Sequence, residues 1–487
     1  MKRQNQEKLI TSFLANNTLI PEDLVTASAE GIEVFNPANN DSLGRVKSFG
    51  KEKTQELIKQ SENSLHDWQQ IGAYRRAEVL HAWANLIEKN AEDLAKIITL
   101  EQGKPITEAR AEINYAKSFV TWFAEEGKRH YGEVIPPCKD GTRMLTMRQP
   151  IGVSAAITPW NFPCAMITRK ASAALAAGCS MIVRPADETP FSAIALQSLA
   201  EQAGIPKGVL STIVGQPEPI VDTLTQSEKV RALSFTGSTK IGKLITEKCA
   251  NTLKKVSMEL GGHAPFIVLE DADIDAAVDG VIAAKFATSG QDCLAVNKCF
   301  VHSRLYAEFV TKVTKQVSKL VVGDGMNENT DIGPLISMAA INKCQEHVDD
   351  ALSKGAKLHV GGSSSEQGKQ YFLPTVICDV NESMLIRQEE TFGPVLAITP
   401  FNDTETLVNE ANNTPYGLAA YIYGSSMKNL WKISEALEYG MVALNTPSMT
   451  GPPIPFGGFK QSGLGREGSK YGLDEYTELK YICLGNM

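Results

Sequence analysis

The chain has 487 residues, which is more than a single hydrophobic core usually organises, so we expect two or three domains. Hydrophobic residues make up 43% and charged residues 21%, as is ordinary for a soluble globular protein. The formal net charge of -8, with Lys and Arg scattered along the chain, argues against a nucleic-acid-binding protein.

Helical periodicity dominates the first third of the chain. Apolar residues recur at helical spacing from Ala77 to Ile98 and again from Ile106 to Glu126, and the second helix is expected to end near Gly127. Asp140-Gly141 then predicts a hairpin turn, followed by interleaved polar and apolar residues from Thr142 to Arg148.

From Pro150 onward, short apolar strands alternate with helices. The predicted strands are Ile151–Ile157, Met181–Val183, Val209–Val214 and Ala232–Phe235. The predicted helices are Ala165–Ala177, Ser192–Ala203 and Thr239–Cys249. This alternation predicts a doubly wound parallel sheet, which binds ligands at the carboxyl ends of its strands. A second α/β region is expected from Gly261 to about Gly458, followed by a final strand over Glu475 to Ile482.

The segment from Phe235 to Lys243 fits two kinds of phosphate site. Gly237 to Lys243 has the spacing of a P-loop, but Leu244 stands where the magnesium-binding hydroxyl must be. Alternatively, a strand leads through Gly237 and Ser238 into a helix whose N-terminal amides face a dinucleotide diphosphate. The G-x-G-x-x-G fingerprint is absent, and a plain strand-to-helix turn would look the same, so this motif alone does not decide.

Three residues are candidates for the chemistry. Cys293 follows the small, polar stretch Ser289 to Asp292, which predicts a loop or a helix start, where amides lower the pKa of a thiol. Glu259 ends an apolar strand before two glycines and is a candidate general base. Asn161 follows the first strand of the parallel region and can donate to an oxyanion. The ordinary alternatives are an inert buried cysteine, a charged surface turn and an Asx turn.

The other cysteines and the histidines indicate neither a disulfide framework nor a metal site. Nine cysteines lack any Cys-x-x-Cys pair, and the seven histidines form no His-x-x-x-His pair. The N-terminus has no signal-type apolar core, and the longest small-apolar run, Ala171 to Gly178, is too short to span a bilayer. We therefore expect a cytoplasmic protein without a metal, membrane or nucleic-acid partner.

Six segments in order resemble the aldehyde dehydrogenase superfamily, over nearly the whole chain. They are Thr158-Pro-Trp-Asn-Phe-Pro163, Phe235-Thr-Gly-Ser238, Glu259-Leu-Gly-Gly262, Gly290-Gln-Asp-Cys293, Glu390-Thr-Phe-Gly-Pro394 and Pro455-Phe-Gly-Gly458. The resemblance implies an aldehyde dehydrogenase-like α/β fold with two doubly wound domains and a small β oligomerisation element. It implies a dinucleotide-binding domain at 1–127 and 151–260, a catalytic domain at 261–460, and an oligomerisation hairpin and tail strand at 128–150 and 475–487.

The resemblance also implies roles for the candidate residues. Cys293 attacks an aldehyde, Asn161 and the Cys293 amide hold the oxyanion, hydride passes to the nicotinamide, and Glu259 activates the water that hydrolyses the thioester. Members that transfer the acyl group to coenzyme A typically lack this base, so a free acid is expected. The implied cofactor-binding residues are Thr158, Trp160, Arg184, Asp187, Gly237, Ser238, Glu390 and Phe392. Lys170 and Glu467 match positions linked to proton relay in some members.

Arg184-Pro-Ala-Asp187 departs twice from the Lys-Pro-(Ser/Ala)-Glu that is usual in the family. An acid at the fourth position accepts hydrogen bonds from the ribose hydroxyls and repels a 2′-phosphate, by of order 1 kcal/mol or more. Arg184 can instead clamp a phosphate bidentately, or simply cover the adenine. We favour NAD as the cofactor, with NADP as the alternative.

Two further stretches, Asn161 to Lys170 and Phe459 to Lys480, resemble succinate-semialdehyde dehydrogenases. In that group two arginines and a hydroxyl bind the carboxylate tail of the aldehyde; Arg169 matches one arginine and Thr450 the hydroxyl, and Phe456 joins them as a substrate-binding residue. Ala287 stands in the place of the second arginine, which removes a charge-assisted hydrogen bond of ~1.5–3 kcal/mol unless Lys285 or Lys298 compensates. The alternative is another polar or uncharged aldehyde, with Arg169 a structural ion-pair residue.

The hairpin and the final strand match the family's oligomerisation elements, so a homodimer or homotetramer is expected. A catalytically silent relative is expected to lack Cys293 or Glu259, and both are present. A P-loop-like nucleotide hydrolase remains the alternative from another class.

Overall fold

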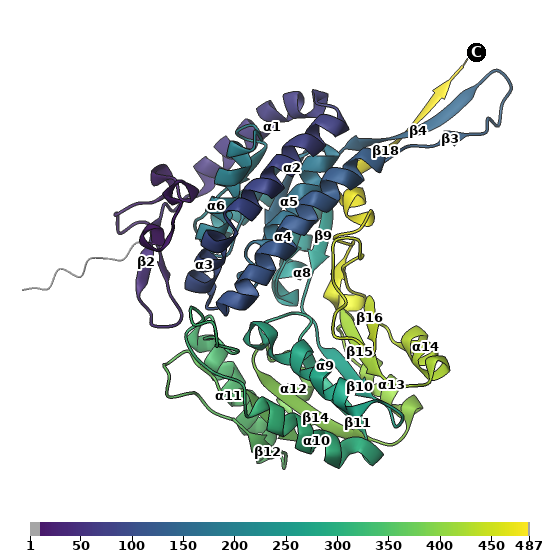
Figure 1. Ribbon diagram of the computed structural model, residues 1–487. Helices are drawn as coiled ribbons and strands as arrows, with labels where there is room; N and C mark the ends of the chain where they lie inside the picture. The colour runs from purple at the N-terminus through teal and green to yellow at the C-terminus, as the bar shows by residue number, and fades with distance from the viewer. Residues whose placement is uncertain (1–9, 486–487) are drawn as a thin grey trace, which may run out of the picture.

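The computed structural model describes residues 10–485, and these form two lobes and a protruding arm (Figure 1). A separate β-sheet lies in each lobe, and a third sheet forms the arm. A small two-stranded sheet near the N-terminus pairs β1 (Ile32–Phe35) with β2 (Ser42–Val46). No helix in the described part is both long and apolar enough to cross a membrane.

The sheet of the first lobe has six strands in the order β17-β9-β8-β5-β6-β7. All its neighbours pair in parallel except β17 and β9, which are antiparallel. Its strands are β5 (Val153–Ile157), β6 (Ser180–Arg184), β7 (Leu210–Thr212), β8 (Val230–Thr236), β9 (Lys255–Glu259) and β17 (Gly463–Leu464). β5 and β6 are buried along their whole length, as expected for strands that helices cover on both faces.

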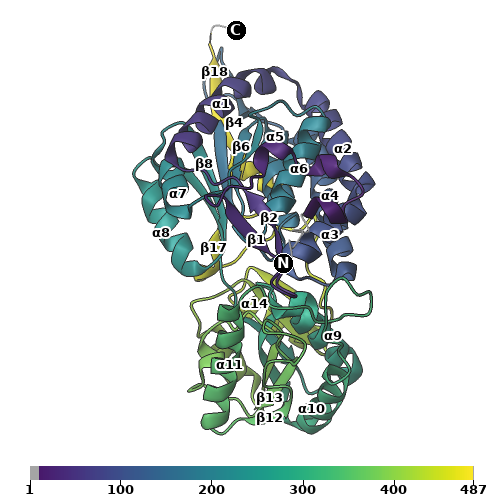
Figure 2. The ribbon, with the colours of Figure 1, turned by 90° about the vertical axis from the view of Figure 1, so that its left-hand side faces the viewer.

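Helices cover both faces of this sheet (Figure 2). One face packs against α1 (Lys51–Gln70), α7 (Pro217–Gln226) and α8 (Thr239–Ala250). The other face packs against α5 (Ala165–Ala177) and α6 (Pro190–Gln202), and α2 (Ala73–Lys89), α3 (Ala91–Gln102) and α4 (Ile106–Glu126) pack on these two helices. Trp83 of α2 is fully buried in this second core, and its indole N–H donates to the carbonyl of Leu196 on α6 at 3.1 Å.

The sheet of the second lobe has seven strands in the order β12-β13-β14-β11-β10-β15-β16, all parallel except the edge pair β12 and β13. Its strands are β10 (Ala264–Val268), β11 (Val296–His302), β12 (Lys357–Val360), β13 (Thr375–Cys378), β14 (Val395–Phe401), β15 (Ala419–Tyr423) and β16 (Met441–Leu444). Its helices are α9 (Ile274–Phe286), α10 (Ser303–Val317), α11 (Met338–Ser353), α12 (Leu385–Gln388), α13 (Thr404–Asn412) and α14 (Met427–Ala436).

The arm joins the predicted hairpin to the final strand. β3 (Val134–Ile135) and β4 (Arg143–Pro150) form the hairpin, and β18 (Thr477–Leu484) pairs with β4 along its whole length. Gly141 turns the hairpin with φ +72°, a conformation that glycine adopts without steric cost. β18 lies at the edge of this sheet, and the arm projects away from the first lobe (Figure 1).

The predicted doubly wound sheet is confirmed, and α4 and α5 have the predicted bounds. The single helix predicted from Ala77 to Ile98 is wrong, because α2 ends at Lys89 and α3 begins at Ala91. Asn90 between them has φ −105° and ψ 19°, and its side-chain amide donates to the carbonyl of Leu86. The predicted domain ranges stay a prediction, and β17 brings a strand from the far end of the chain into the first sheet.

The strand ends of the two large sheets face each other between the lobes. β5, β8 and β9 end there, at the carboxyl edge of the first sheet, where Glu259 is the last residue of β9. The chain enters β11 and β14 at the opposite, amino edge of the second sheet, shortly after Cys293 and Glu390. A cleft between the lobes therefore collects the predicted motifs from both.

Candidate active site

A cavity of about 300 Å³ opens beside Cys293, a size at the lower end of the range for small-molecule sites. Its wall comes from α4, α5, the loop that ends at Leu294, and the segment from Thr450 to Phe456. The residues that line it are Glu108, Ala111, Glu112, Tyr115, Phe162, Met166, Arg169, Ala287, Thr288, Asp292, Cys293, Leu294, Thr450 and Phe456. All three predicted substrate-binding residues therefore share one wall with the predicted nucleophile.

Cys293 lies in a turn between a short 3-10 helix, η5 (Ala287–Gly290), and β11. Its side chain is half-buried, and burial raises the pKa of the thiol well above its usual range. The carboxylate of Asp292 raises that pKa further, whereas Arg169 acts to lower it. The loop predicted from sequence is present, and no helix starts at Cys293. The expected lowering of the thiol pKa is wrong, because burial raises that pKa. The thiol needs a base before it can attack.

The backbone just before Cys293 is strained. Thr288 and Ser289 have φ +52° and +55°, and Gly290 follows with φ +71°, so three successive residues are left-handed. Such a conformation costs of order 1–3 kcal/mol at a non-glycine residue and persists only where the surroundings enforce it. Here the carboxylate of Glu108 on α4 accepts a hydrogen bond from the Thr288 amide at 2.8 Å, and the Ser289 hydroxyl donates to the carbonyl of Gly333 at 3.1 Å.

Glu259 is buried, and neither carboxylate oxygen has a hydrogen-bond partner in the described part of the chain. Burial raises the pKa of Glu259 well above its usual range, and the negative charge of Glu467 adds to that rise. The charges of Arg169 and Lys170 act in the opposite direction. A buried carboxylate that binds nothing else and holds its proton more tightly than usual is suited to accept a proton from water or from a thiol.

Arg169, Lys170 and Glu467 form a buried ion cluster beside Glu259. Arg169 Nε donates to Glu467 at 2.6 Å, Lys170 Nζ bonds the other carboxylate oxygen, and Lys170 Nζ also donates to Thr236 Oγ1 at 2.7 Å. Burial acts to raise the pKa of Glu467, but the two cations outweigh it and hold that pKa below its usual range. Arg169 is thus an ion-pair residue and part of the cavity wall at once.

Asn161 is buried next to the loop that carries Cys293. Its Nδ2 donates to the carbonyl of Gln291 at 3.1 Å, which uses one of its two N–H groups. Its own carbonyl accepts a hydrogen bond from Lys104 at 2.8 Å, and this holds the residue in place. The second N–H of the side chain makes no hydrogen bond within residues 10–485.

The two lysines considered as substitutes for the missing arginine do not line the Cys293 cavity as far as the structure describes it. Lys285 is fully buried at the end of α9, its amine has no partner among residues 10–485, and burial lowers its pKa to about 8. Lys298 lies in β11, and burial, followed by the charge of Arg387, lowers its pKa to about 8. Neither lysine takes the place of the arginine at Ala287.

A second cavity, of about 460 Å³, follows the carboxyl edge of the first sheet. Thr158, Arg184 and Gly237 line it, and the hydroxyl of Thr158 and Nε of Arg184 are buried there without a partner in the described chain. A Cβ at Gly237 would lie 2.5 Å from the Phe235 ring, so this turn accommodates only glycine without a shift of that ring. Ser238 caps α8 by accepting a hydrogen bond from the Ile241 amide, Ile241 of the first turn lines the cavity, and these features fit a dinucleotide.

Glu390 and Phe392 reach the same cleft from the second lobe. Glu390 accepts a hydrogen bond from the Gly262 amide at 3.3 Å, and burial raises its pKa to about 7. Phe392 has φ +55°, and its ring meets the edge of Trp160 at 5.6 Å between centroids. None of these three residues lines either cavity as far as the structure describes it, so their predicted contact with the cofactor stays a prediction.

Arg184 and Asp187 are paired with each other. Arg184 Nη2 donates to Asp187 Oδ1 at 2.7 Å and approaches the carbonyl of Gly215 at 3.3 Å. Burial raises the pKa of Asp187, while the guanidinium acts to lower it. The pair is thus neutralised at the position where the adenosine ribose is expected.

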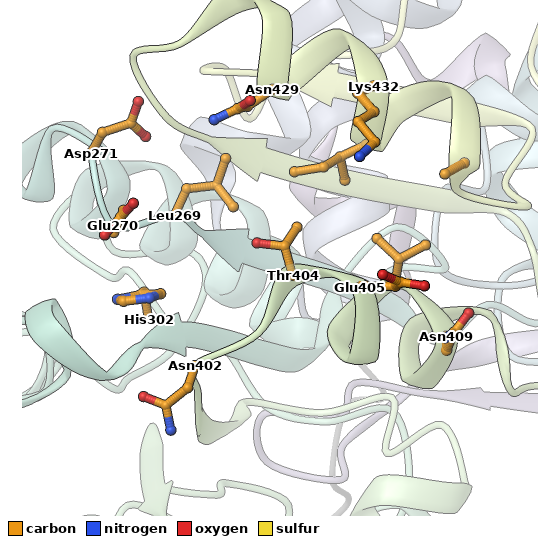
Figure 3. Close-up of a pocket in the computed structure, with 13 residues that line it drawn as sticks. Leu269, Glu270, Asp271, His302, Asn402, Thr404, Glu405, Asn409, Asn429 and Lys432 are labelled. Carbon is orange, nitrogen blue, oxygen red and sulfur yellow. The ribbon is translucent and has the colours of Figure 1, made fainter.

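The P-loop alternative loses its structural basis. α8 starts at Thr239, so Gly242 and Lys243 lie within the helix rather than in a loop before it, and the Lys243 amine donates to Gln461 at 2.8 Å. Another cavity, of about 700 Å³, lies at the carboxyl edge of the second sheet beside Glu270, His302 and Lys432 (Figure 3). It contains none of the predicted site residues.

Sequence reasoning did not single out two acidic residues of the Cys293 cavity, Glu108 and Asp292. Glu108 lies in a helix with no local motif, and its partner Thr288 is 180 positions away along the chain. Asp292 directly precedes Cys293 in the sequence, and its acidic side chain at that position was a signal that could have identified it.

The chain matches the family model described as "Aldehyde dehydrogenase family" over residues 24–482. It is 49% identical to the NADP(+) succinate-semialdehyde dehydrogenase GabD of Escherichia coli (strain K12), over 94% of this chain and 95% of that protein. It is also 49% identical to the non-phosphorylating aspartate-semialdehyde dehydrogenase of Halomonas elongata, over 93% of this chain and 92% of that protein. The crystal structure of an E. coli NADP-dependent enzyme superposes with a TM-score of 0.95 at 47% identity, over 97% of this chain and 100% of that one.

Proposed function

This chain belongs to the aldehyde dehydrogenase family, and from that premise we propose that it oxidises a short aldehyde with an anionic tail, such as succinate semialdehyde, to the free acid. The observation that carries the proposal is the shared wall of one small cavity, where Cys293 and Arg169 lie together with Thr450 and Phe456. The names of the two relatives above also refer to four-carbon aldehydes that end in a carboxylate.

The first half of the reaction belongs to Cys293. Glu259 accepts the proton of the thiol, and the sulfur forms a bond to the carbonyl carbon, whose oxygen becomes an alkoxide. The free N–H of Asn161 and the Cys293 amide donate to that oxygen, which stabilises the charge in a site shielded from water. NAD(P)+, when bound, supplies a hydride acceptor for the carbon, so that the adduct becomes a thioester.

The second half belongs to Glu259. After the first proton has passed from Glu259 to solvent, its unpartnered oxygens accept a proton from a water molecule, and the resulting hydroxide attacks the thioester carbonyl. The carbon–sulfur bond then breaks to release the carboxylic acid, and the Cys293 thiolate takes back the proton held by Glu259. Because this base is present, the product is a free acid rather than an acyl-coenzyme A.

Arg169 binds the carboxylate of the tail. Its Nε is committed to Glu467, but Nη1 makes no hydrogen bond within residues 10–485, so a donor remains for the substrate. The guanidinium also lies 4.1 Å from the centre of the Phe456 ring, which fixes its plane. Thr450 supplies a hydroxyl on the same wall.

Initial rates with a panel of aldehydes test this function. Succinate and glutarate semialdehydes are expected to exceed uncharged aldehydes of equal length in kcat/KM. Arg169→Ala is expected to lower the kcat/KM of charged relative to uncharged aldehydes by roughly tenfold or more, beyond the loss that all substrates share because Arg169 also pairs with Glu467. Cys293→Ser is expected to abolish turnover and the acyl-enzyme that intact-protein mass spectrometry detects in the unmodified protein. Glu259→Gln is expected to slow both the formation and the hydrolysis of that acyl-enzyme. A preference for uncharged aldehydes together with a silent Arg169→Ala would contradict the proposal.

A further inference from the structure

The wall of the Cys293 cavity holds more acidic than basic side chains. Three acids and one arginine line it. Glu112 is fully committed, because it bonds Lys104 and accepts hydrogen bonds from the amides of Cys164 at 2.9 Å and Ala165 at 3.2 Å. The remaining two acids, Glu108 and Asp292, have no ion-pair partner in the described part of the chain.

Glu108 lies beside the position of the missing arginine. Its Oε2 accepts a hydrogen bond from the amide of Thr288, the residue after Ala287, while Oε1 makes no hydrogen bond within residues 10–485. Ala287 lines the same cavity and contributes only a methyl group. Burial raises the pKa of Glu108 to about 7, and Lys104, whose charge acts to lower it, pairs with Glu112. Where the semialdehyde group discussed above has a cation, this chain therefore presents an acid that has no ion-pair partner of its own within residues 10–485.

Asp292 places a second carboxylate next to the reacting sulfur. Its Oδ1 accepts a hydrogen bond from the Leu294 amide at 2.9 Å, and the side chain is half-buried on the cavity wall. Its charge opposes the formation of a Cys293 thiolate, as the raised pKa of that thiol shows. A carboxylate that opposes the nucleophile has to be compensated, and the two cations that act on Asp292, Lys104 and Arg169, already pair with Glu112 and Glu467.

We infer that the substrate tail carries an ammonium group next to its carboxylate, so that the substrate is the aldehyde of an α-amino acid. The ammonium binds Asp292 and Glu108, and the carboxylate binds Arg169. This rests on the proposed function, because it needs Arg169 to hold the carboxylate. A semialdehyde whose tail carries only a carboxylate brings a further negative charge to two acids that have no ion-pair partner. The ammonium group of an amino-acid aldehyde would compensate the charges of these acids.

Four aldehydes separate the two charges of the tail. Aspartate semialdehyde carries both groups, succinate semialdehyde lacks only the ammonium, 3-aminopropanal lacks only the carboxylate, and propanal lacks both. The kcat/KM of aspartate semialdehyde is expected to exceed that of succinate semialdehyde by roughly tenfold or more, as one charge-assisted hydrogen bond provides. The ratio of these two values cancels effects on the thiol, the cofactor and the hydrolysis step.

Three substitutions are expected to change the ratio of kcat/KM for aspartate semialdehyde to that for succinate semialdehyde. Asp292→Asn and Glu108→Gln keep the shape and remove one charge each, and each is expected to lower the ratio several-fold. Ala287→Arg restores a cation and is expected to lower the ratio further. Asp67→Asn, the same chemical change at an exposed position on α1, is expected to leave the ratio unchanged. Calorimetric binding of aspartate and of succinate to each variant reports the same preference in a variant that no longer turns over.

Each outcome assigns the error to one step. If succinate semialdehyde is the better substrate and Asp292→Asn leaves the ratio unchanged, the ammonium site is wrong while the proposed function stands. If 3-aminopropanal exceeds aspartate semialdehyde, the acids bind a cation but Arg169 does not bind the tail, so the proposed function fails at that point. If propanal matches all three, both inferences fall.

Discussion

Glu259 has to be ionised to act as a base, yet burial and the neighbouring Glu467 raise its pKa. Below that pKa the carboxyl is protonated, so kcat is expected to fall as the pH decreases through it. Glu467→Gln removes a charge that raises this pKa and leaves Arg169 and Lys170, which lower it. The acidic limb of the kcat profile is therefore expected to move to lower pH.

The same substitution leaves two buried cations without their partner, which costs about 3–5 kcal/mol of unfolding free energy. Denaturant unfolding measures this loss separately from the pH profile. Glu435→Gln, an exposed change in α14, serves as the control for both measurements. An acidic limb that stays in place, or that moves to higher pH, would show that Glu259 does not set it.

We expect Asp187 to set the preference of the enzyme for NAD over NADP. Its carboxylate is partly neutralised by Arg184, so its repulsion of a 2′-phosphate is weak but present. Asp187→Ser removes the like charge and frees Arg184 for the phosphate, and the NADP-to-NAD ratio of kcat/KM is expected to rise roughly fivefold or more, which corresponds to about 1 kcal/mol. Glu188→Gln removes the adjacent charge outside the pair and is expected to leave the ratio unchanged; an unchanged ratio in Asp187→Ser would remove Asp187 from the ribose site.

At the scale of single residues, the sequence predicts those site residues that lie in a short, recognisable motif. Cys293, Glu259 and Asn161 each stand next to glycines or prolines that mark a turn at a strand or loop end, and the structure brings them to one cleft. Glu108 has no such neighbours, and only the fold places it against Thr288. The raised pKa of Cys293 could not be predicted either, because it depends on burial and on charges from distant segments.

The element that carries the nucleophile is the left-handed turn before Cys293, and Gly290 is its tightest point. A Cβ at Gly290 would lie 2.3 Å from the carbonyl oxygen of Gly393, in the loop that follows Glu390 and Phe392. Gly290→Ala therefore has to push the nucleophile loop and the Glu390 loop apart. We expect a loss of at least tenfold in kcat and of about 1–3 kcal/mol in unfolding free energy beyond the conformational cost.

The variant Gly141→Ala measures the conformational cost of a left-handed alanine without a steric contact. Gly141 has φ +72°, against +71° at Gly290, and nothing lies within 4 Å of a Cβ there. It is expected to lose about 1 kcal/mol and no activity, because only the left-handed backbone is penalised. If the two variants lose equal stability and keep equal kcat, the contact with Gly393 does not matter.

Elements were predicted well where the periodicity was uniform and less well where a tertiary contact interrupts it. The helix predicted across Asn90 shows why: apolar residues on both sides keep one helical period, so the pattern contains no break. Asn90 breaks the helix because its side chain bonds the Leu86 carbonyl and receives a hydrogen bond from Asn16, 74 positions earlier. A partner so distant leaves no trace in the local sequence.

At the scale of the whole molecule, the alternation of strands and helices predicts two α/β regions but not the order of their strands. The second sheet places β10 next to β15, although four strands separate them in the chain. The same limit applies to the arm, where β18 pairs with β4 over more than three hundred positions of sequence. The hairpin turn could be predicted locally, whereas the pairing of the final strand with the hairpin was not predicted and is seen only in the structure.

The arm exposes apolar side chains that an isolated chain has no reason to present to water. Leu479 and Tyr481 of β18 are 58% and 54% exposed, and β18 has an open strand edge beside them. We therefore propose that the arm binds a second copy of this chain, in a homodimer or a homotetramer. Each of these side chains would contribute about 1.5–3 kcal/mol when buried in such an interface.

Charges in the arm test this assembly. Leu479→Glu combined with Tyr481→Glu is expected to weaken association roughly hundredfold, because at least about 3 kcal/mol of apolar burial is lost and two carboxylates enter the interface. Light scattering coupled to size-exclusion chromatography measures the molar mass across a dilution series. Tyr74→Glu changes a 73% exposed tyrosine on α2 and is expected to leave the mass unchanged. If the double variant remains folded and keeps the mass of the unmodified protein at every dilution, the interface lies on another face of the molecule.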